Sequence, residues 1–247
     1  MKLPEGFRLA AFDDIDSTNT EAARRAASGE AGGLVVWAKS QGAGRGRRGR
    51  SWISLPGNLY VSLLLRPHAP PRAALALGFA AALAVAEAIQ TTAPGAIVGL
   101  KWPNDVLLGG KKVAGCLLES RVGPDGRPEW LVIGTGVNVA HHPEGTEFPA
   151  THLAQAESTV CIESVLEAYL ASFARWQGRW ENQGFEPIRQ AWLGLAVGLG
   201  QPIKVRLENE TLDGRFAALD AHGGLELAMD DGSVRVITAG DVFPGRT

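Results

Sequence analysis

A short stretch rich in glycine and arginine is the first feature of this sequence that indicates chemistry. Residues 41–52 have the sequence QGAGRGRRGRSW, with four arginines within six positions. Glycines let backbone N–H groups approach an anion closely, and arginine carries a permanent charge on planar donors that match carboxylate and phosphate groups. The stretch lacks the Gly-Lys-Ser/Thr ending of a P-loop and opens no helix in a βαβ unit. It therefore predicts an anion-binding loop, with a solvated basic turn or a nucleic-acid patch as the alternative.

Three other stretches place polar side chains where apolar, strand-like runs begin or end. A proline-fixed corner with the sequence KWPND presents a lysine, an amide and a carboxylate. A second lysine leads directly into the apolar run 113–118, and an asparagine lies inside the run 133–139, where a buried amide must find partners. Taken alone, these last two are more simply a solvated hairpin charge and a core amide. The side chains concerned are Lys101, Asn104, Asp105, Lys112 and Asn138.

Helices must hold these segments in place, and the patterning predicts three long ones. Thr18 and Glu21 have the spacing of a capping box, which predicts a helix over 18–28. A helix over 73–88 is apolar nearly all round and is therefore expected to pack on both sides. Apolar residues spaced three and four apart predict one amphipathic helix over 162–192.

Strand-like runs separated by turn signals make up most of the remaining chain. They are expected at 33–38, 58–65, 97–101, 113–122 and 130–139, and then, after a change of texture, at 203–207, 212–219, 225–229 and 234–237. The order of these elements predicts an α+β fold with a mixed, mostly antiparallel sheet and flanking helices over residues 1–197. A small β-barrel domain is expected over residues 198–247.

The overall composition is that of an ordinary globular protein. With 45% hydrophobic residues, 20% charged residues and a formal net charge of -2, the chain has no general surface for polyanions, so nucleic acid is not the default partner. The longest apolar run is shorter than the roughly 20 residues that span a bilayer, and the N-terminus lacks the apolar core of a signal peptide. Two cysteines, Cys116 and Cys161, make no disulfide framework. We therefore expect a cytoplasmic protein without a membrane segment.

Together these stretches resemble the biotin-protein ligase family over roughly residues 12–140. The matching elements occur in the family's order and spacing: STN at 17–19, GRGRRG at 44–49, KWPND at 101–105, Lys112 before an Ala-Gly pair, and GTGVN at 134–138. The resemblance implies a catalytic domain related to class II aminoacyl-tRNA synthetases, followed by the family's SH3-like domain.

The resemblance also assigns roles to individual residues. Hydroxyls and amides would hold the neutral ureido ring of biotin, and cations its carboxylate; the matching positions are Ser17, Thr18, Asn19, Gln41, Arg45, Gly46, Arg47 and Lys112. The nucleotide-side positions are Trp52, Lys101, Asn104 and Asn138. Trp52 would pack on adenine, or alternatively anchor the loop to the core. Arg47 and Lys112 would neutralise developing charge, and Asp105 is a candidate proton acceptor or orienting carboxylate.

The implied reaction is a two-step acyl transfer from biotin and Mg-ATP to a lysine of a biotin carboxyl carrier protein. Magnesium would arrive with ATP, and neither a resident metal nor a prosthetic group is expected. Only 16 residues precede the STN motif, fewer than the about 60 that a small domain needs, so we expect no DNA-binding arm, no specific DNA and no repressor function. The sequence leaves the oligomeric state open, with a homodimer as one candidate.

Two rival functions follow from the same residues. A lipoate-protein ligase would perform the same chemistry on a dithiolane acid, although the arginine-rich loop weighs against it. A non-enzymatic nucleic-acid binder would use the four arginines on phosphates. In either case, crowded arginines repel one another unless a counter-charge is present, so we expect the loop to be mobile until an anionic ligand binds.

Overall fold

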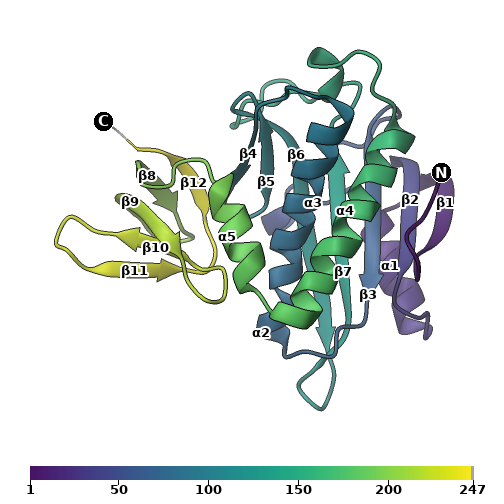
Figure 1. Cartoon of the computed structure of the whole chain (residues 1–247), viewed down its shortest axis with the longest axis horizontal. Coiled ribbons are helices and arrows are strands. Elements are labelled where there is room, and N and C mark those ends of the chain that lie inside the picture. Colours follow the sequence, from purple (N-terminus) through teal and green to yellow (C-terminus); the bar gives the residue numbers. More distant parts are fainter. Residues whose placement is uncertain (246–247) are drawn as a thin grey trace.

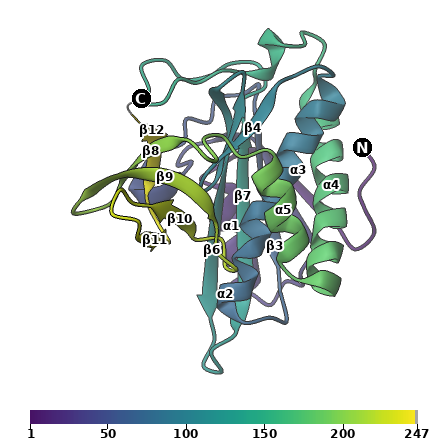
Figure 2. The same cartoon turned by 60° about the vertical axis from the view of Figure 1, so that its left-hand side comes forward.

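Two β-sheets form the framework of the protein (Figure 1). The structure is a computed structural model that describes residues 1–245. The larger sheet has seven strands in the order β1-β2-β3-β7-β6-β5-β4, and the smaller has five in the order β11-β10-β9-β8-β12. The small sheet lies beside the edge of the large sheet that ends in β5 and β4, as the two views agree (Figures 1 and 2).

The large sheet confirms the prediction of a mixed, mostly antiparallel arrangement. Its strands are β1 Arg8–Ile15, β2 Leu34–Gln41, β3 Leu59–Leu65, β4 Val98–Lys101, β5 Asp105–Leu108, β6 Lys111–Val122 and β7 Pro128–Val137. β1 and β2 are parallel, and every other neighbouring pair is antiparallel. The strand prediction missed β1, an edge strand with three charged residues, and β5, which has only four residues. Neither carries a strong local pattern, so pairing with a neighbour decides their conformation.

Helices cover both faces of the large sheet, and alternate residues of its strands face each side. Helix α1, Thr18–Ala27, packs on the face to which Leu34 and Val36 point. Helices α3, Ala76–Thr92, and α4, Ile162–Gln183, enclose the main core on the opposite face, where Val35 is buried. Burial on both faces explains why β3 is apolar along its whole length.

Three helix predictions need correction. The predicted helix over 73–88 is preceded by a separate turn, α2 Pro71–Ala74, before α3 begins. The predicted helix over 162–192 is interrupted at Gly184, whose φ of 71° ends α4, and the chain resumes as α5, Glu186–Gly194. The capping box at Thr18 is also wrong.

The residue that caps α1 is Ser17, one position earlier than predicted. Its side chain accepts a hydrogen bond from the backbone N–H of Thr20 at 3.4 Å. Glu21 instead forms ion pairs with Arg24 and Arg25 on its own helix. The shift matters because it leaves the hydroxyl of Thr18 free for contacts outside the helix.

Burial accounts for the apolar character of α2 and α3. The span Pro71–Thr92 is long and apolar enough to cross a membrane by length and composition, yet 72% of its most apolar window is buried inside the protein. Helix α3 packs against the large sheet and also against α4 and α5, which lie beside it (Figure 2). A helix packed on both sides needs apolar residues all round, which explains this sequence without a membrane.

The small sheet consists of β8 Pro202–Arg206, β9 Thr211–Leu219, β10 Leu225–Ala228, β11 Val234–Ile237 and β12 Asp241–Pro244. The sequence did not predict β12, which pairs antiparallel with β8. The sheet is joined to the large one by packing and hydrogen bonds. The indole of Trp102 donates to the carbonyl oxygen of Gly223 at 3.0 Å, in a buried contact next to Phe79. The corner after β4 is therefore held by the C-terminal sheet.

Candidate active site

One cavity of about 320 Å³ is lined by all thirteen residues that the sequence singled out. The cavity has a size common for small-molecule sites. Its walls come from the start of α1, the end of β2, the arginine-rich loop, the corner between β4 and β5, and the facing surfaces of β6 and β7. The predicted residues at its surface are Ser17, Thr18, Asn19, Gln41, Arg45, Gly46, Arg47, Trp52, Lys101, Asn104, Asp105, Lys112 and Asn138.

A chain of buried polar side chains forms one end of the cavity. Thr18 donates its hydroxyl and its backbone N–H to Oε1 of Gln41, at 3.0 and 2.8 Å. Gln41 in turn donates from Nε2 to the hydroxyl of Ser54 at 2.9 Å. Ser62, which sequence analysis missed, lies 2.8 Å from Oγ1 of Thr18 and 2.6 Å from Oδ1 of Asn19. Fixed donors and acceptors in a buried pocket can recognise a neutral polar ring.

The arginine-rich loop folds onto carboxylates from other parts of the chain. Arg45 pairs with Oε2 of Glu119 at 3.1 Å. Arg48 lies 3.5 Å from Oδ2 of Asp241, and Arg50 forms a closer ion pair with the same oxygen. The premise that only an anionic ligand supplies a counter-charge to these arginines is therefore wrong, because two distant acidic residues supply one; the mobility of the ligand-free loop stays a prediction.

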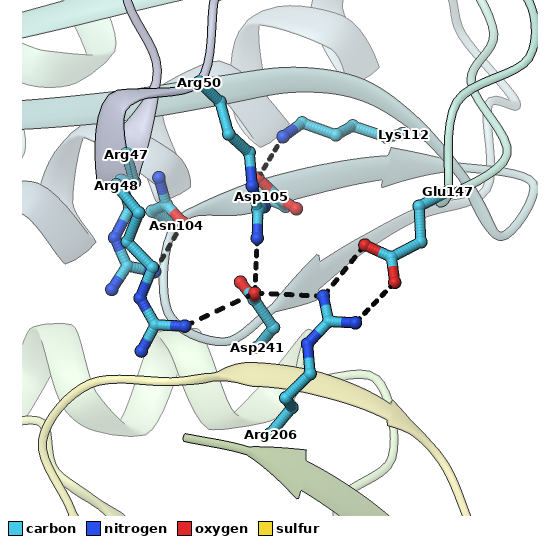
Figure 3. Close-up of polar contacts among 9 residues, drawn as sticks. All are labelled: Arg47, Arg48, Arg50, Asn104, Asp105, Lys112, Glu147, Arg206 and Asp241. Carbon is cyan, nitrogen blue, oxygen red and sulfur yellow. Dashed lines mark hydrogen bonds and ion pairs between the residues drawn. The ribbon is translucent and has the colours of Figure 1, made fainter. Parts of the chain in front are cut away.

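Asp241 is the centre of this charge network (Figure 3). Its side chain also accepts from Arg206 of β8 at 3.4 Å, and Arg206 donates twice to Glu147, at 2.6 and 2.9 Å. Burial alone would raise the pKa of Asp241, but the hydrogen bond and charge of Arg50, with help from Arg206, hold it below its usual value. The C-terminal sheet thus contributes charges to the cavity, and no local sequence signal marked them.

An ion pair lies at the middle of the cavity wall. Nζ of Lys112 is 2.6 Å from Oδ1 of Asp105, and the two side chains are only 27% and 12% exposed. The backbone of Lys112 is fixed on both sides, because its N–H donates to Pro149 and its carbonyl oxygen accepts from Thr151. Lys112 is therefore a held cation at the start of β6 rather than a solvated hairpin charge.

Asn104 holds a second cation at the same wall. Its Nδ2 donates to the carbonyl oxygen of Cys116 at 2.5 Å, which turns Oδ1 toward NH1 of Arg47 at 3.3 Å (Figure 3). Burial lowers the pKa of Arg47, although a guanidinium stays charged near neutral pH. Since this contact is with a neutral amide, Arg47 keeps its charge available for an incoming anion.

Lys101 contributes a third cation, in unusual surroundings. Its Nζ lies 3.2 Å from the centre of the Phe148 ring, and that ring stacks on Phe243 of β12 with centres 4.8 Å apart. Burial lowers the pKa of Lys101 to about 8. An anion beside it would favour the charged form, so ligand binding and protonation at Lys101 are coupled.

Two glycines of the GTG segment on β7 make room for site residues. A Cβ atom at Gly136 would fall 2.5 Å from Cε2 of Trp52, whose ring therefore lies directly on the strand. A Cβ atom at Gly134 would fall 2.8 Å from Cγ of Asn19. Nζ of Lys112 lies 5.4 Å from the centre of the Trp52 ring, on the cavity side. These glycines are needed for close approach rather than for a special backbone conformation.

Asn138 has a structural partner as well as a place at the cavity. Its Nδ2 donates to the carbonyl oxygen of Thr151 at 3.0 Å, and its backbone N–H donates to Val113 at 2.8 Å. The bond to Thr151 holds the loop that carries Glu147 and Phe148 against the end of β7, and the bond to Val113 ties this end of β7 to β6. The side chain of Asn138 thus has the hydrogen-bond partner expected of a buried amide, and it also lines the cavity.

Comparison with known proteins identifies the class to which this fold and site belong. Residues 11–138 match the model of the biotin/lipoate A/B protein ligase family, and residues 198–245 match that of the biotin protein ligase C-terminal domain. The chain belongs to the biotin protein ligase family, and it is an enzyme of the ligase class.

Individual relatives support this assignment along nearly the whole chain. A biotin–[acetyl-CoA-carboxylase] ligase of Paracoccus denitrificans is 42% identical over 93% of this chain and 98% of its own length. The bifunctional ligase/repressor BirA of Bacillus subtilis is 34% identical over 95% of this chain and 73% of its own length. The biotin protein ligase of Aquifex aeolicus, solved in complex with biotin and ATP, superposes with a TM-score of 0.80 at 28% identity and covers 96% of this chain and 97% of that one.

Proposed function

We propose that this enzyme activates biotin with Mg-ATP to biotinyl-5'-AMP and transfers the biotinyl group to a lysine of a biotin carboxyl carrier protein. One observation carries the proposal: a buried pocket of hydroxyls and amides and three half-buried cations line the same cavity. Biotin has a neutral polar ring and an acid tail, and ATP carries phosphates, so these two substrates together need such a combination of groups. The named relatives of this chain and the Aquifex complex with biotin and ATP support the same substrates.

The polar end of the cavity would hold the ureido ring. Thr18, Gln41 and Asn19 offer fixed hydroxyl and amide groups there, and Ser17 borders them at the helix start. Arg45 and the backbone of Gly46 would close this end from the arginine-rich loop. The valerate chain would then run toward Arg47 and Lys112, which places the substrate carboxylate among cations.

In the first step, a carboxylate oxygen of biotin attacks the α-phosphorus of ATP, the bond to the pyrophosphate oxygen breaks, and a mixed anhydride forms. Two anions must approach each other, so positive groups that are already in place lower the barrier. We assign this role to Arg47 and Lys112, with Asn104 fixing the position of the first. Lys101, Trp52 and Asn138 would line the nucleotide side, and Mg²⁺ would enter with ATP as part of the substrate.

In the second step, the amine of the carrier lysine attacks the biotinyl carbonyl carbon, an amide forms, and AMP leaves with the bonding electrons. The attacking lysine is protonated in water near neutral pH and must lose a proton. Asp105 lies on the same cavity wall as Lys112. Because the two side chains form an ion pair, the first role that we assign to Asp105 is to orient Lys112. We propose that it accepts or directs the proton only when the carrier lysine approaches.

The contacts favour biotin over the two rivals. A dithiolane ring has no N–H or C=O groups, so it would gain no polar contacts from Thr18, Asn19 and Gln41 at this end of the cavity, whereas a ureido ring would. A nucleic-acid binder would leave its arginines unpaired for phosphates, whereas three of the four are paired with carboxylates of the same chain. We further propose that residues 198–247 act as a separate domain. We also propose that the enzyme works in the cytoplasm and catalyses the ligase reaction alone, without DNA-binding repression.

Exchange of labelled pyrophosphate into ATP tests the proposal. We expect exchange that depends on biotin and is not supported by lipoate, and labelling of a carrier domain that stops when its acceptor lysine is changed to arginine. Exchange with lipoate in place of biotin would assign the enzyme to the rival reaction. If neither acid supported exchange, the ligase proposal would be wrong.

A further inference from the structure

Glu119 lies outside every motif, yet it connects two residues of the cavity. It belongs to β6, on the same side of the strand as Gly115 and Leu117, which line the cavity. One oxygen, Oε2, accepts from Nδ2 of Asn19 at 2.6 Å and from NH2 of Arg45 at 3.1 Å. A single carboxylate oxygen thus holds a residue of α1 and a residue of the arginine-rich loop.

The first consequence is a fixed amide at Asn19. A carboxylate can only accept, so the amide must turn its Nδ2 toward Glu119. The carbonyl oxygen Oδ1 then faces the hydroxyl of Ser62 at 2.6 Å. Asn19 is 4% exposed and packs over Gly134, where a Cβ atom would fall 2.8 Å from its Cγ. Because the hydroxyl of Ser62 can donate or accept, it is Glu119 that decides that Nδ2 is the end facing β6 and that Oδ1 is the accepting end.

The second consequence is a difference in charge compensation between Arg45 and Arg47. Arg45 is neutralised by the carboxylate of Glu119, whereas the hydrogen bond of Arg47 is with the neutral amide of Asn104. A charge-compensated guanidinium suits the neutral head of an acid, and an uncompensated one suits its carboxylate or a phosphate. Without Glu119, two uncompensated arginines would stand close together and compete for the same anion.

We propose that Glu119 is a positioning residue for the acid substrate, which orders Asn19 and Arg45 around its neutral head. The inference rests on the proposed function, because it concerns how that substrate is held. It differs from a general stabilising role, since the affected residues all lie at the head-group end of the cavity. The nucleotide side, with Lys101 and Asn104, has no contact with this carboxylate among the described residues.

The test compares Glu119→Gln with the wild-type chain in biotin-dependent pyrophosphate exchange. Glutamine keeps the shape and can still offer one amide oxygen to both donors, but it removes the negative charge that compensates Arg45 and strengthens both hydrogen bonds. We expect KM for biotin to rise about tenfold or more, the usual effect of losing a charge-assisted hydrogen bond. KM for ATP and kcat should stay within about twofold. Glu119→Asp keeps the charge on a shorter side chain and should give an intermediate KM for biotin.

A matched control is Glu129→Gln, which removes a carboxylate from the neighbouring strand β7. Glu129 pairs with Arg121 at 3.1 Å on the surface, away from the cavity lining, so its loss should leave both KM values unchanged. An unchanged KM for biotin in Glu119→Gln would overturn the inference, as would equal losses for biotin, ATP and thermal stability. Absence of biotin-dependent exchange in the wild-type chain would instead overturn the proposed function together with the inference.

Discussion

The ion pair between Lys112 and Asp105 allows a cycle of variants that separates chemistry from stability. The two atoms are 2.6 Å apart and the aspartate side chain is 12% exposed. Lys112→Met removes a charge-assisted hydrogen bond of about 1.5–3 kcal/mol and leaves the carboxylate without its partner, at a cost of a similar size. We therefore expect the free energy of unfolding to fall by about 3–5 kcal/mol. The double variant Lys112→Met/Asp105→Asn leaves no unpaired charge and should lose only about 1 kcal/mol.

The rate should behave differently from the stability. If Lys112 stabilises charge as the carboxylate and the α-phosphate meet, its loss lowers the exchange rate on the order of a hundredfold to a thousandfold. Adding Asp105→Asn restores stability but no cation, so the rate should stay low. Lys111→Met, at the exposed neighbouring lysine, is the control and should change neither quantity.

Two measurements complete the cycle: unfolding in urea followed by tryptophan fluorescence, and biotin-dependent pyrophosphate exchange at saturating substrates. Recovery of the exchange rate in the double variant to within about tenfold of wild type would refute the reasoning. In that case Lys112 would serve mainly to neutralise Asp105, and the charge stabilisation would have to come from Arg47 alone.

Three further predictions follow from the site. Burial lowers the pKa of Lys101 to about 8, so this lysine loses its charge as the pH rises through that value. We therefore expect kcat/KM for ATP to fall above pH 8 in the wild type and to stay flat in Lys101→Met. A parallel fall in both proteins would contradict this prediction. Gly136→Ala forces the ring of Trp52 off β7, so we expect the free energy of unfolding in urea to fall by about 1–3 kcal/mol, the tryptophan fluorescence to change and ATP binding by titration to weaken. An unchanged fluorescence spectrum would show that the ring does not lie on the strand. The pKa of Asp241 is held below its usual value, so the carboxylate stabilises the protein above the ordinary aspartate pKa and this contribution is lost as the pH falls through the folded-state pKa. Asp241→Asn should therefore lower the free energy of unfolding, measured in urea at pH 7, by about 1–3 kcal/mol. Equal stability of both proteins at that pH would argue against the network.

Local patterns predicted most of the regular structure, and they failed where the structure depends on distant contacts. The apolar run of α3 and the spacing of α4 are strong local signals, since each helix must bury a face. The break at Gly184 was missed, because the apolar spacing continues on both sides of it. Edge strand β1 and the four-residue strand β12 have little pattern of their own, and only pairing with β2 and β8 makes them strands.

The site was predictable to the extent that its residues lie in short segments of unusual composition. The crowding of glycine and arginine at 41–52 predicts an anion-binding loop from the chemistry of these two residue types alone. The grouping of the KWPND corner with that loop came from the resemblance to a family, and the structure places both at one cavity. Glu119, Ser62 and Asp241 escaped notice, because an isolated polar residue in a strand has no local signature.

The sequence by itself determined which chemical groups this protein possesses and which segments carry them, because composition and spacing are properties of the chain. It determined the cations for an acid and a phosphate, and the glycines that give their neighbours room. The tertiary structure alone decided how these charges are balanced. Asp241 reaches Arg48 and Arg50 across about 190 residues of chain, as Glu119 reaches Arg45 across about 70, and such distances close only when the whole chain has folded. Electrostatic interactions depend on separation in space, which spacing along a sequence does not specify.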